Sequence, residues 1–475
     1  MNVDSNELIQ QAYKKIITLK ELKKAGFICR QGGFFPSVHY PPITMYSPTD
    51  EQKLFKDYRI PADGLFVIYA HIPFCITYCK FCHYPVKIRS SVQEKDCYLD
   101  ALKKEMDIYM RRLAVKKLKA RSVLIGGGTP TYLTPAQLER FLIFFTARVN
   151  LQSCTQFSYD VDPSTLLGRE GEERLGIMKS YGVDRLTIGV QSLEDRILKR
   201  MNRAHTAQEA IQAIEEARKS GFKINIEFIY GYPGQTMEDW VNTMTKAVKL
   251  GVEEIQLYRL KIIPYGDHKG FITKEFAAKP NEFAADEQEI LMKETAILIL
   301  RENGYRENLR RVFTRGNNDY SRYADDQCCK LFDQIGFGLT AFSSLRDRFG
   351  LNTQFFKNYY SLIKQGKMPL DRGIIRNKDA QLRWAIVLPL KNRTVYKKFY
   401  QKCAGISLDN IFRKKIERLK EYGFLKETDM TLQTTDLGSF FSDEVCHQFH
   451  HPRYMPFPKS AYANGPLNPY NDPNP

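Results

Sequence analysis

The sequence predicts an α/β protein, in which a partial barrel of six β/α units precedes a mostly helical C-terminal domain. Two observations predict this fold. Through residues 65–260, short apolar runs typical of strands alternate with helical stretches, a pattern that implies parallel strands covered by helices. After about residue 378, a helical pattern leads to a glycine turn and two short strand-like runs. This second pattern resembles a winged-helix element.

Each expected strand is followed by an expected helix. The expected strands are 65–71, 122–125, 155–161, 184–190, 223–229 and 254–260, and the helices between them are 92–113, 135–149, 172–180, 206–220 and 238–250. Six units suit a partial barrel better than a closed one of eight units. In both cases an active site would lie at the C-terminal ends of the strands.

A chain of 475 residues is longer than one ordinary core requires, so further segments are expected around the barrel. We divide it into an N-terminal helix and extended arm (1–50), the barrel (51–265), a core extension (266–375), the C-terminal domain (376–450) and an irregular tail (451–475).

Composition predicts a soluble cytoplasmic protein. No apolar run is long enough to span a bilayer, and the N-terminus lacks the apolar centre of a signal peptide. Ten cysteines scattered over this length indicate a reducing compartment rather than a disulfide framework. The net charge of +17 fits an ordinary solvated surface, or contact with an anionic membrane or an acidic ligand. The spread of the basic residues disfavours nucleic acid.

Three cysteines follow the first expected strand and carry most of the chemical information. Cys75, Cys79 and Cys82 form a C-x3-C-x2-C pattern. A cubane iron–sulfur cluster normally has four thiolate ligands, so three would leave one iron open to a reactive ligand. A zinc site would need four nitrogen or sulfur ligands, usually as two spaced pairs, and no second pair is evident. Three unrelated thiols are the remaining alternative.

Other polar or glycine-rich positions also follow expected strands. Gly126, Gly127 and Gly128, with Thr129, could let the backbone approach a ligand, or could form a tight turn. Asp160 and Asp162 follow the third strand, where Asp162 also suits a helix N-cap. Gln191 follows the fourth strand, and Arg203 could pair with a carboxylate.

Two further positions have polar side chains within apolar strands. Glu227 lies in the fifth strand, and because an unpaired buried charge is costly, it should contact a ligand or an Arg or Lys. Tyr69 and His71 share a face of the first strand. His71 could be a core histidine, although its nearness to the cysteines indicates a functional role.

These motifs together resemble those of a known family. YAHIPFC-x3-C-x2-C, GGGTPTYL, DVDP, GVQS, NRAH and IYGYPGQT are similar to motifs of radical S-adenosylmethionine (SAM) enzymes of the oxygen-independent coproporphyrinogen oxidase group. The resemblance extends from about residue 65 to 440. It implies a [4Fe-4S] cluster on Cys75, Cys79 and Cys82, with SAM bound to the open iron and cleaved by one-electron reduction to a 5′-deoxyadenosyl radical.

The resemblance also implies SAM contacts. By motif these are Tyr69, Gly127, Gly128, Thr129, Asp160, Gln191, Arg203, Glu227 and Lys261. The family often has Glu at position 160 and Asp at position 227, so the charge is kept but the reach differs by one methylene. Alanine is typical near Lys261, where the contact would come from the backbone.

Two departures narrow the implied function. In coproporphyrinogen decarboxylases the corresponding cysteine motif resembles C-x3-C-x2-C-G-C. This chain instead has His83 and Tyr84 after Cys82. Related haem chaperones have an H-N-x-x-Y-W signature, which the stretch SRYADDQCCKLFDQIGFG lacks. The chain is more similar to class C methyltransferases, which bind two SAM molecules and methylate an sp2 carbon.

The terminal segments specify the expected substrate. FFPSVHYPPITMY and YMPFPKSAYANGPLNPY resemble segments of members that methylate menaquinone at C8, so we expect 8-methylmenaquinone as the product. The alternatives are an anaerobic tetrapyrrole enzyme, which decarboxylates coproporphyrinogen III or opens haem, and a non-enzymatic haem chaperone. Expected partners are a flavodoxin or ferredoxin as electron donor and the inner face of an anionic membrane. The roles of Cys328 and Cys329 stay open.

Overall fold

The computed structural model describes residues 5–30, 39–263, 268–316 and 319–471. Part of the quinone-related segment, residues 34–38, and the end of the tail, residues 472–475, therefore lie outside the described residues. Within the described part, no helix is long and apolar enough to cross a membrane.

The predicted parallel sheet is confirmed and extends further than expected. The six predicted strands correspond to β2 (Leu65–Ile72), β5 (Leu118–Gly127), β7 (Phe157–Val161), β8 (Arg185–Gln191), β9 (Lys223–Tyr230) and β10 (Glu254–Arg259). They pair in chain order and in parallel. A seventh strand, β13 (Gln334–Phe337), adds in parallel beside β2. It comes from the segment whose pattern was mixed.

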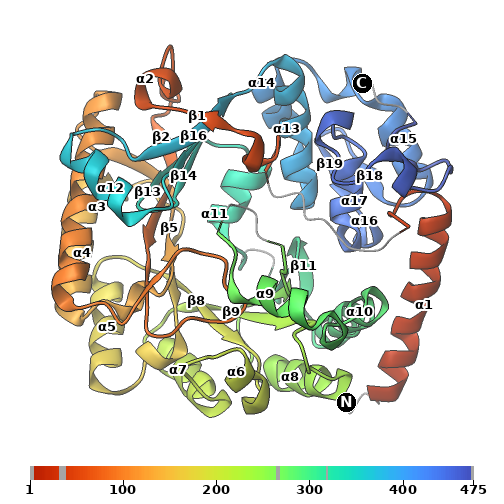
Figure 1. The fold of residues 1–475 in the computed structure, drawn as a ribbon, viewed down its shortest axis with the longest axis horizontal. Helices are drawn as coiled ribbons and strands as arrows, with labels where there is room; N and C mark the ends of the chain where they lie inside the picture. Colours follow the sequence, from red (N-terminus) through yellow and green to blue (C-terminus); the bar gives the residue numbers. More distant parts are fainter. Residues whose placement is uncertain (1–4, 31–38, 264–267, 317–318, 472–475) are drawn as a thin grey trace.

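Further strands lengthen both ends of this sheet. Beyond β13 lie β14 (Phe342–Leu345), β15 (Arg348–Asn352), β16 (Leu370–Ile375) and the short β1 (Ser47–Pro48), all antiparallel to their neighbours. Beyond β10 lie β12 (Val312–Thr314) and β11 (Arg306–Leu309). The barrel is therefore open, and Figure 1 shows that its sheet is curved.

The crossover helices cover the outer face of the sheet. They are α3 (Val92–Leu113), α4 (Pro135–Arg148), α5 (Gly168–Ser180), α7 (Ala207–Lys219) and α8 (Met237–Lys249), with the short α6 (Asp195–Arg200) before α7. Four of them begin with a capping box, in which a Ser or Thr and an acidic or amide residue three positions later satisfy free backbone amides. The barrel strands are buried and largely apolar, as expected for a sheet covered on both faces.

Two outer helices complete this layer. The N-terminal α1 (Ser5–Lys24) packs along α10 (Asp286–Glu302), at the right of Figure 1. Ion pairs join them, including Lys15 with Glu294 at 3.4 Å and Lys20 with Glu287 at 3.5 Å.

The C-terminal region has the predicted winged-helix-like form. It contains α13 (Lys378–Lys391), α14 (Lys397–Ala404), α15 (Arg413–Glu421) and a three-stranded antiparallel sheet of β17 (Thr394–Tyr396), β19 (Thr431–Thr434) and β18 (Leu425–Glu427). Two short helices, α16 (Asp436–Phe440) and α17 (Ser442–His447), follow it.

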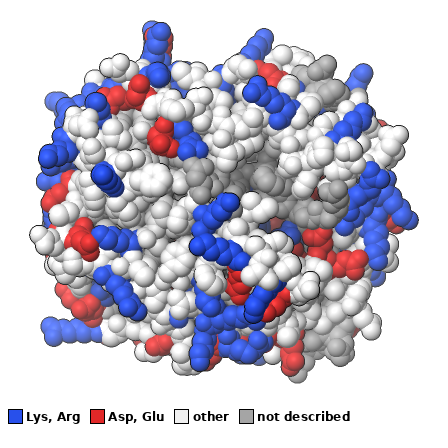
Figure 2. Space-filling view, in the orientation of Figure 1, with Lys and Arg blue, Asp and Glu red and all other residues white. Residues whose placement is uncertain are grey.

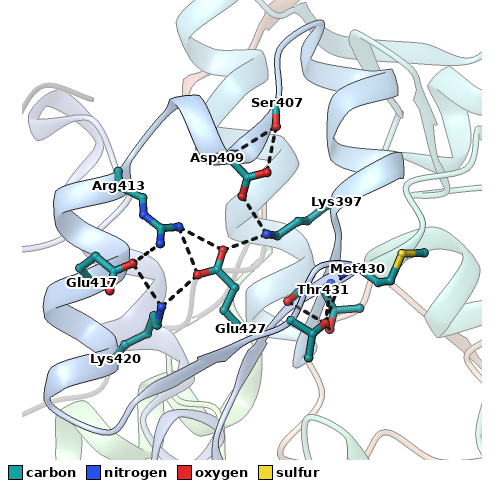
Figure 3. A network of polar contacts seen from close by, with 10 residues as sticks. Lys397, Ser407, Asp409, Arg413, Glu417, Lys420, Glu427, Met430 and Thr431 are labelled. Carbon is teal, nitrogen blue, oxygen red and sulfur yellow. Dashed lines mark hydrogen bonds and ion pairs between the residues drawn. The ribbon is translucent and has the colours of Figure 1, made fainter.

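Several basic residues of this region are engaged in ion pairs. Figure 3 shows Glu427 contacting Lys397, Arg413 and Lys420. Figure 2 likewise shows acidic side chains beside the denser groups of Lys and Arg on the face of Figure 1. Both observations favour a solvated surface over a nucleic-acid groove.

A buried carboxylate ties the crossover helix α3 to the added strands. Glu105 is fully buried and accepts hydrogen bonds from Gly338 N (2.8 Å), Asn352 Nδ2 (2.8 Å) and Tyr359 Oη (2.6 Å). Nearby, Tyr98 of α3 donates to His71 O at 2.8 Å. The position of the C-terminal end of β2 therefore depends on α3.

Replacing Glu105 by Ala should lower the free energy of unfolding by about 3 kcal/mol or more, because three buried donors lose their acceptor. The free energy is measured by chemical denaturation. Glu302→Ala, at an exposed position at the end of α10, is the control and should change it little. Equal effects of the two variants would contradict this role for Glu105.

Candidate active site

The three cysteines lie together on the loop that follows β2, and each sulfur has a hydrogen-bond donor. Thr129 Oγ1 lies 3.7 Å from Cys75 Sγ, Arg203 Nη1 lies 3.1 Å from Cys79 Sγ, and the backbone amide of Tyr84 lies 3.4 Å from Cys82 Sγ. Thr129 and Arg203 come from other elements and hold the loop against the barrel, whereas Tyr84 belongs to the loop itself. Donors of this kind stabilise thiolates.

The cysteine loop fits a cluster better than a single metal ion. Among the described residues, no three His, Cys, Asp or Glu side chains converge closely enough to hold one ion, as a structural zinc site requires. In a cluster each thiolate ligates a different iron, so the sulfurs need not converge. Burial raises the pKa of Cys75 to about 12 and that of Cys82 to about 11, so metal coordination is what would deprotonate them.

The glycine triplet leaves room beside the cysteines. A Cβ atom on Gly128 would lie 2.7 Å from Phe74 O and 2.8 Å from Cys75 Sγ. Gly127 has φ +122°, and its Cβ would lie 2.9 Å from Ile72 O. The amides of Gly128 and Thr129 donate to Ile72 O and Phe74 O, so the contribution of the triplet is space rather than these two amides.

Arg203 links the cysteine loop to two strand ends. Its Nη2 lies 2.6 Å from Asp162 Oδ2 and 2.7 Å from Gly189 O. Burial alone would raise the pKa of Asp162, but Arg203 and His205 outweigh burial and hold this pKa well below its usual range. Asp162 also accepts from Ser164 N, so it is both the expected N-cap and the partner of Arg203.

Asp160 and Glu227 form a pair of carboxylates with unusually high pKa values. They come from β7 and β9, on either side of β8. Burial, with the neighbouring charge of Glu227, raises the pKa of Asp160 to about 8, and burial raises that of Glu227 to about 7. Among the described residues, Glu227 accepts its side-chain hydrogen bond from Tyr258 Oη, at 3.1 Å, rather than from the Arg or Lys that the sequence led us to expect. Such a pair is suited to ligand hydroxyl groups or to a cation.

His71 presents a buried nitrogen without a partner. Its Nδ1 lies 2.9 Å from Tyr69 Oη, whereas Nε2 has no hydrogen-bond partner in the described part of the chain. Burial lowers the pKa of His71 to about 3, so the ring is neutral. Together with the room left by the glycines, this nitrogen is what a bound cofactor would be expected to meet.

Gln191 and Lys261 complete the predicted set. Gln191 ends β8 in the left-handed region (φ +70°) and is buried. Lys261 follows β10, and its carbonyl oxygen is bonded to His83 Nε2 at 2.9 Å. Burial and the charges of Lys391 and Arg311 lower the pKa of Lys261 to about 6.

Several residues near the site had no sequence signal. Tyr258 is one, and Tyr323 is another, with its ring 6.3 Å from that of Tyr69. Tyr323 precedes a π-helical turn, Asp325–Cys329, a feature common at functional sites. In this turn Cys329 is buried against Asn392 O, whereas Cys328 is only partly buried. A regular helical pattern could not reveal this turn.

Comparisons with known proteins agree with this geometry. Residues 69–247 match the model of the radical SAM superfamily. The haem chaperone HemW of Bacillus subtilis (strain 168) is 27% identical over 388 residues, which cover 80% of this chain and 98% of that protein. The oxygen-independent coproporphyrinogen III oxidase of Pseudomonas aeruginosa is 23% identical over 444 residues, covering 88% and 92%.

A solved structure shows the same fold. Coproporphyrinogen III oxidase (HemN) from Escherichia coli, described as a radical SAM enzyme, superposes with a TM-score of 0.72 at 23% identity, covering 86% of this chain and 96% of that one. Residues 69–247 therefore match the radical SAM superfamily, and most of the chain is similar in sequence and fold to oxygen-independent coproporphyrinogen oxidases and to the haem chaperone HemW. This similarity implies a [4Fe-4S] cluster and SAM. These matches give no support to the quinone-methylating branch.

Gly128→Ala should reduce cluster incorporation, because the new Cβ would overlap Phe74 O and Cys75 Sγ and the strain would cost about 1–3 kcal/mol. The readout is iron and sulfide per protein after anaerobic reconstitution. Gly176→Ala, in α5 with no atom within 4 Å of the new Cβ, is the matched control. Full cluster content in Gly128→Ala would show that the loop can shift without loss.

Asp160→Asn should reduce the loss of stability that the ligand-free protein shows as pH rises. The folded protein keeps a proton on this carboxyl up to about pH 8, whereas the unfolded chain releases it near its ordinary pKa of about 3.9. The free energy of unfolding therefore falls as pH rises from the pKa of the unfolded chain to that of the folded protein. From pH 5 to pH 8 the free energy of unfolding should fall for both proteins. It should fall by at least about 1 kcal/mol less for Asp160→Asn than for wild type.

Chemical denaturation at several pH values measures this difference. Asp429→Asn, in the exposed turn between β18 and β19, serves as the control. Parallel pH profiles for wild type and Asp160→Asn would contradict the raised pKa.

Proposed function

We propose that this protein is a radical SAM C-methyltransferase that uses two SAM molecules and methylates menaquinone at C8. The observation that carries the proposal is the pair of residues after the third cysteine. In coproporphyrinogen decarboxylases the two residues after the third cysteine of the motif resemble Gly-Cys. In this chain these residues are His83 and Tyr84. The extra thiol of a decarboxylase is therefore missing beside the cluster loop.

In the structure, His83 and Tyr84 have different roles. His83 Nδ1 accepts from Gly270 N at 3.1 Å, which leaves Nε2 to donate to Lys261 O. The imidazole thus fastens the cysteine loop to the segment after β10. Tyr84 is 56% exposed, and its ring lies 6.2 Å from that of His71. An exposed aromatic ring beside the cysteine loop suits a planar ring as substrate.

The residues present fit both implied cofactors. Cys75, Cys79 and Cys82 would hold the cluster, and the partnerless nitrogen of His71 and the Asp160–Glu227 pair would face SAM. When bound and reduced, the cluster and SAM would supply a 5′-deoxyadenosyl radical. The protonated carboxyls can donate to ligand oxygens or accept from ribose hydroxyls without placing a second net charge in the barrel.

Exposed apolar side chains around the cysteine loop support a lipid-borne substrate. Tyr84, Ile88, Val92, Phe271 and Phe355 are each more than 40% exposed. Two of them contact the loop directly: Ile88 pairs with Cys75 in a short ladder, and Lys80 lies over Phe271. Such a rim, on a chain of net charge +17, suits the inner face of an anionic membrane. A flavodoxin or ferredoxin would supply the electron.

Tetrapyrrole chemistry is the second candidate, and the comparisons favour it. The relatives that match nearly end to end are named as a haem chaperone and a coproporphyrinogen III oxidase. Under this alternative the chain would decarboxylate coproporphyrinogen III, open haem, or bind haem without turnover.

Anaerobic assays of the reconstituted protein with SAM, a reductant and each substrate separate these functions. Methyl transfer predicts 8-methylmenaquinone with S-adenosylhomocysteine and 5′-deoxyadenosine. Carbon dioxide from coproporphyrinogen III, or stoichiometric haem binding without SAM cleavage, would reject it. Cys79→Ala should abolish the brown colour and all SAM cleavage, whereas Cys97→Ala, at an exposed position on α3, should keep both.

A further inference from the structure

Two loops interlock around Cys79, the second of the three cysteines. On one side of it, Asn202 Nδ2 donates to Tyr78 O at 2.8 Å. On the other side, the backbone amide of Lys80 donates to Met201 O at 3.1 Å. The loop that follows α6 therefore holds the chain on both sides of Cys79 and fixes what comes next to its sulfur.

Arg203 lies in this loop and is the charged donor among the three that contact the cysteine sulfurs in the described chain. Its Nη1 lies 3.1 Å from Cys79 Sγ, whereas a hydroxyl group contacts Cys75 and a backbone amide contacts Cys82. The Arg203 side chain is only 8% exposed, so solvent and salt screen its charge little. The sulfur of Cys79 therefore lies in a more positive environment than the other two.

Asp162 orients the guanidinium. Arg203 Nη2 donates to Asp162 Oδ2 at 2.6 Å and to Gly189 O at 2.7 Å, which directs Nη1 at the sulfur. Asp162 is itself held by the backbone amide of Ser164, which donates to it at 3.0 Å. The Arg203–Asp162 pair is thus a fixed dipole whose positive end contacts Cys79.

A dipole in this position bears on a one-electron reduction. On reduction, a [4Fe-4S] cluster held by these cysteines would gain one electron, and with it one negative charge. Hydrogen bonds to the sulfurs and nearby charges set the reduction potential of such clusters. A cation beside a ligand sulfur stabilises the reduced form more than the oxidised form, because the attraction grows with the negative charge. A nearby carboxylate has the opposite effect.

We propose that Arg203 and Asp162 tune the reduction potential of the cluster in opposite directions. Arg203 raises the potential through the sulfur of Cys79, and Asp162 limits the rise. In this role both are positioning residues, because they act through a ligand of the cluster. Arg203 Nε has no hydrogen-bond partner among the described residues and stays available for the expected SAM contact. The proposal does not depend on the substrate, so it holds for methyl transfer and for tetrapyrrole chemistry alike.

Redox titration of the cluster-loaded protein tests this proposal without turnover. SAM is left out, because it would act on the cluster and on Arg203 together. The readout is the fraction of reduced cluster at each set potential, followed by electron paramagnetic resonance. The variants Arg203→Gln and Asp162→Asn each remove one charge. Asparagine keeps an oxygen that can accept from Arg203, so the second variant changes charge more than shape.

Arg203→Gln should lower the equilibrium constant for reduction by about tenfold, because a hydrogen bond from a charged group is lost. For a one-electron couple this lowers the potential by about 59 mV. Asp162→Asn should raise the potential. Arg196→Gln and Asp239→Asn are the matched controls, because this pair is also 2.6 Å apart but the Arg196 side chain is 59% exposed. Neither control should shift the potential.

The signs of the two shifts separate this role from a structural one. If the two residues only anchored the loop, either substitution would loosen it and admit water, and both potentials would move in the same direction. Shifts of the same sign, or no shift in one or both variants, would overturn the proposal. If Arg203→Gln does not retain a cluster, Arg203→Lys replaces it. A downward shift is again expected, because lysine lacks the fork that reaches Cys79 and Asp162 together.

Discussion

The common edge at which the parallel strands end is the constraint on which the site depends. Parallel strands need crossover connections, so their C-terminal ends gather on one edge and their N-terminal ends on the other. The cysteines follow β2, the glycines follow β5, Asp162 follows β7, and Gln191 ends β8. Arg203 then joins three of these strand ends through Cys79, Asp162 and Gly189. A shift of one strand would break this bridge.

Burial of polar groups is the second feature of the site. Asp160 and Glu227 are kept protonated by burial, His71 is kept neutral, and Lys391 has a lowered pKa. Burial is the main cause of each shift, so each group is held in its less charged form. A barrel that only needed stability would place apolar residues there, so the unmet groups indicate where ligands must bind.

The sequence predicted the barrel well because its signals are local. Each strand is a short apolar run, and four helices begin with a capping box that can be read within four residues. The predicted site residues of the first five strands are brought to one edge for the same reason. β13 was missed because its four residues have no helix pattern around them and pair with β2 across more than 260 positions.

The residues that the sequence could not predict are those placed by tertiary packing. Nothing near Tyr258 or Arg311 in the chain indicates that Tyr258 contacts Glu227 or that Arg311 lies over the ring of Tyr258. The hydrogen bonds of His83 depend on the position of Gly270, which lies almost 190 residues further along. The role of Gly270 follows from close approach, since a Cβ there would lie within 3.1 Å of His83 Nδ1.

The radical SAM match and the residues that bear on the substrate lie in different parts of the chain. The superfamily match covers residues 69–247, which include the cysteines and all the predicted SAM contacts except Lys261. The terminal segments that resemble those of quinone-methylating proteins lie outside this region. The core that is similar to coproporphyrinogen oxidases and haem chaperones is therefore separate in the chain from the segments on which the proposed substrate depends.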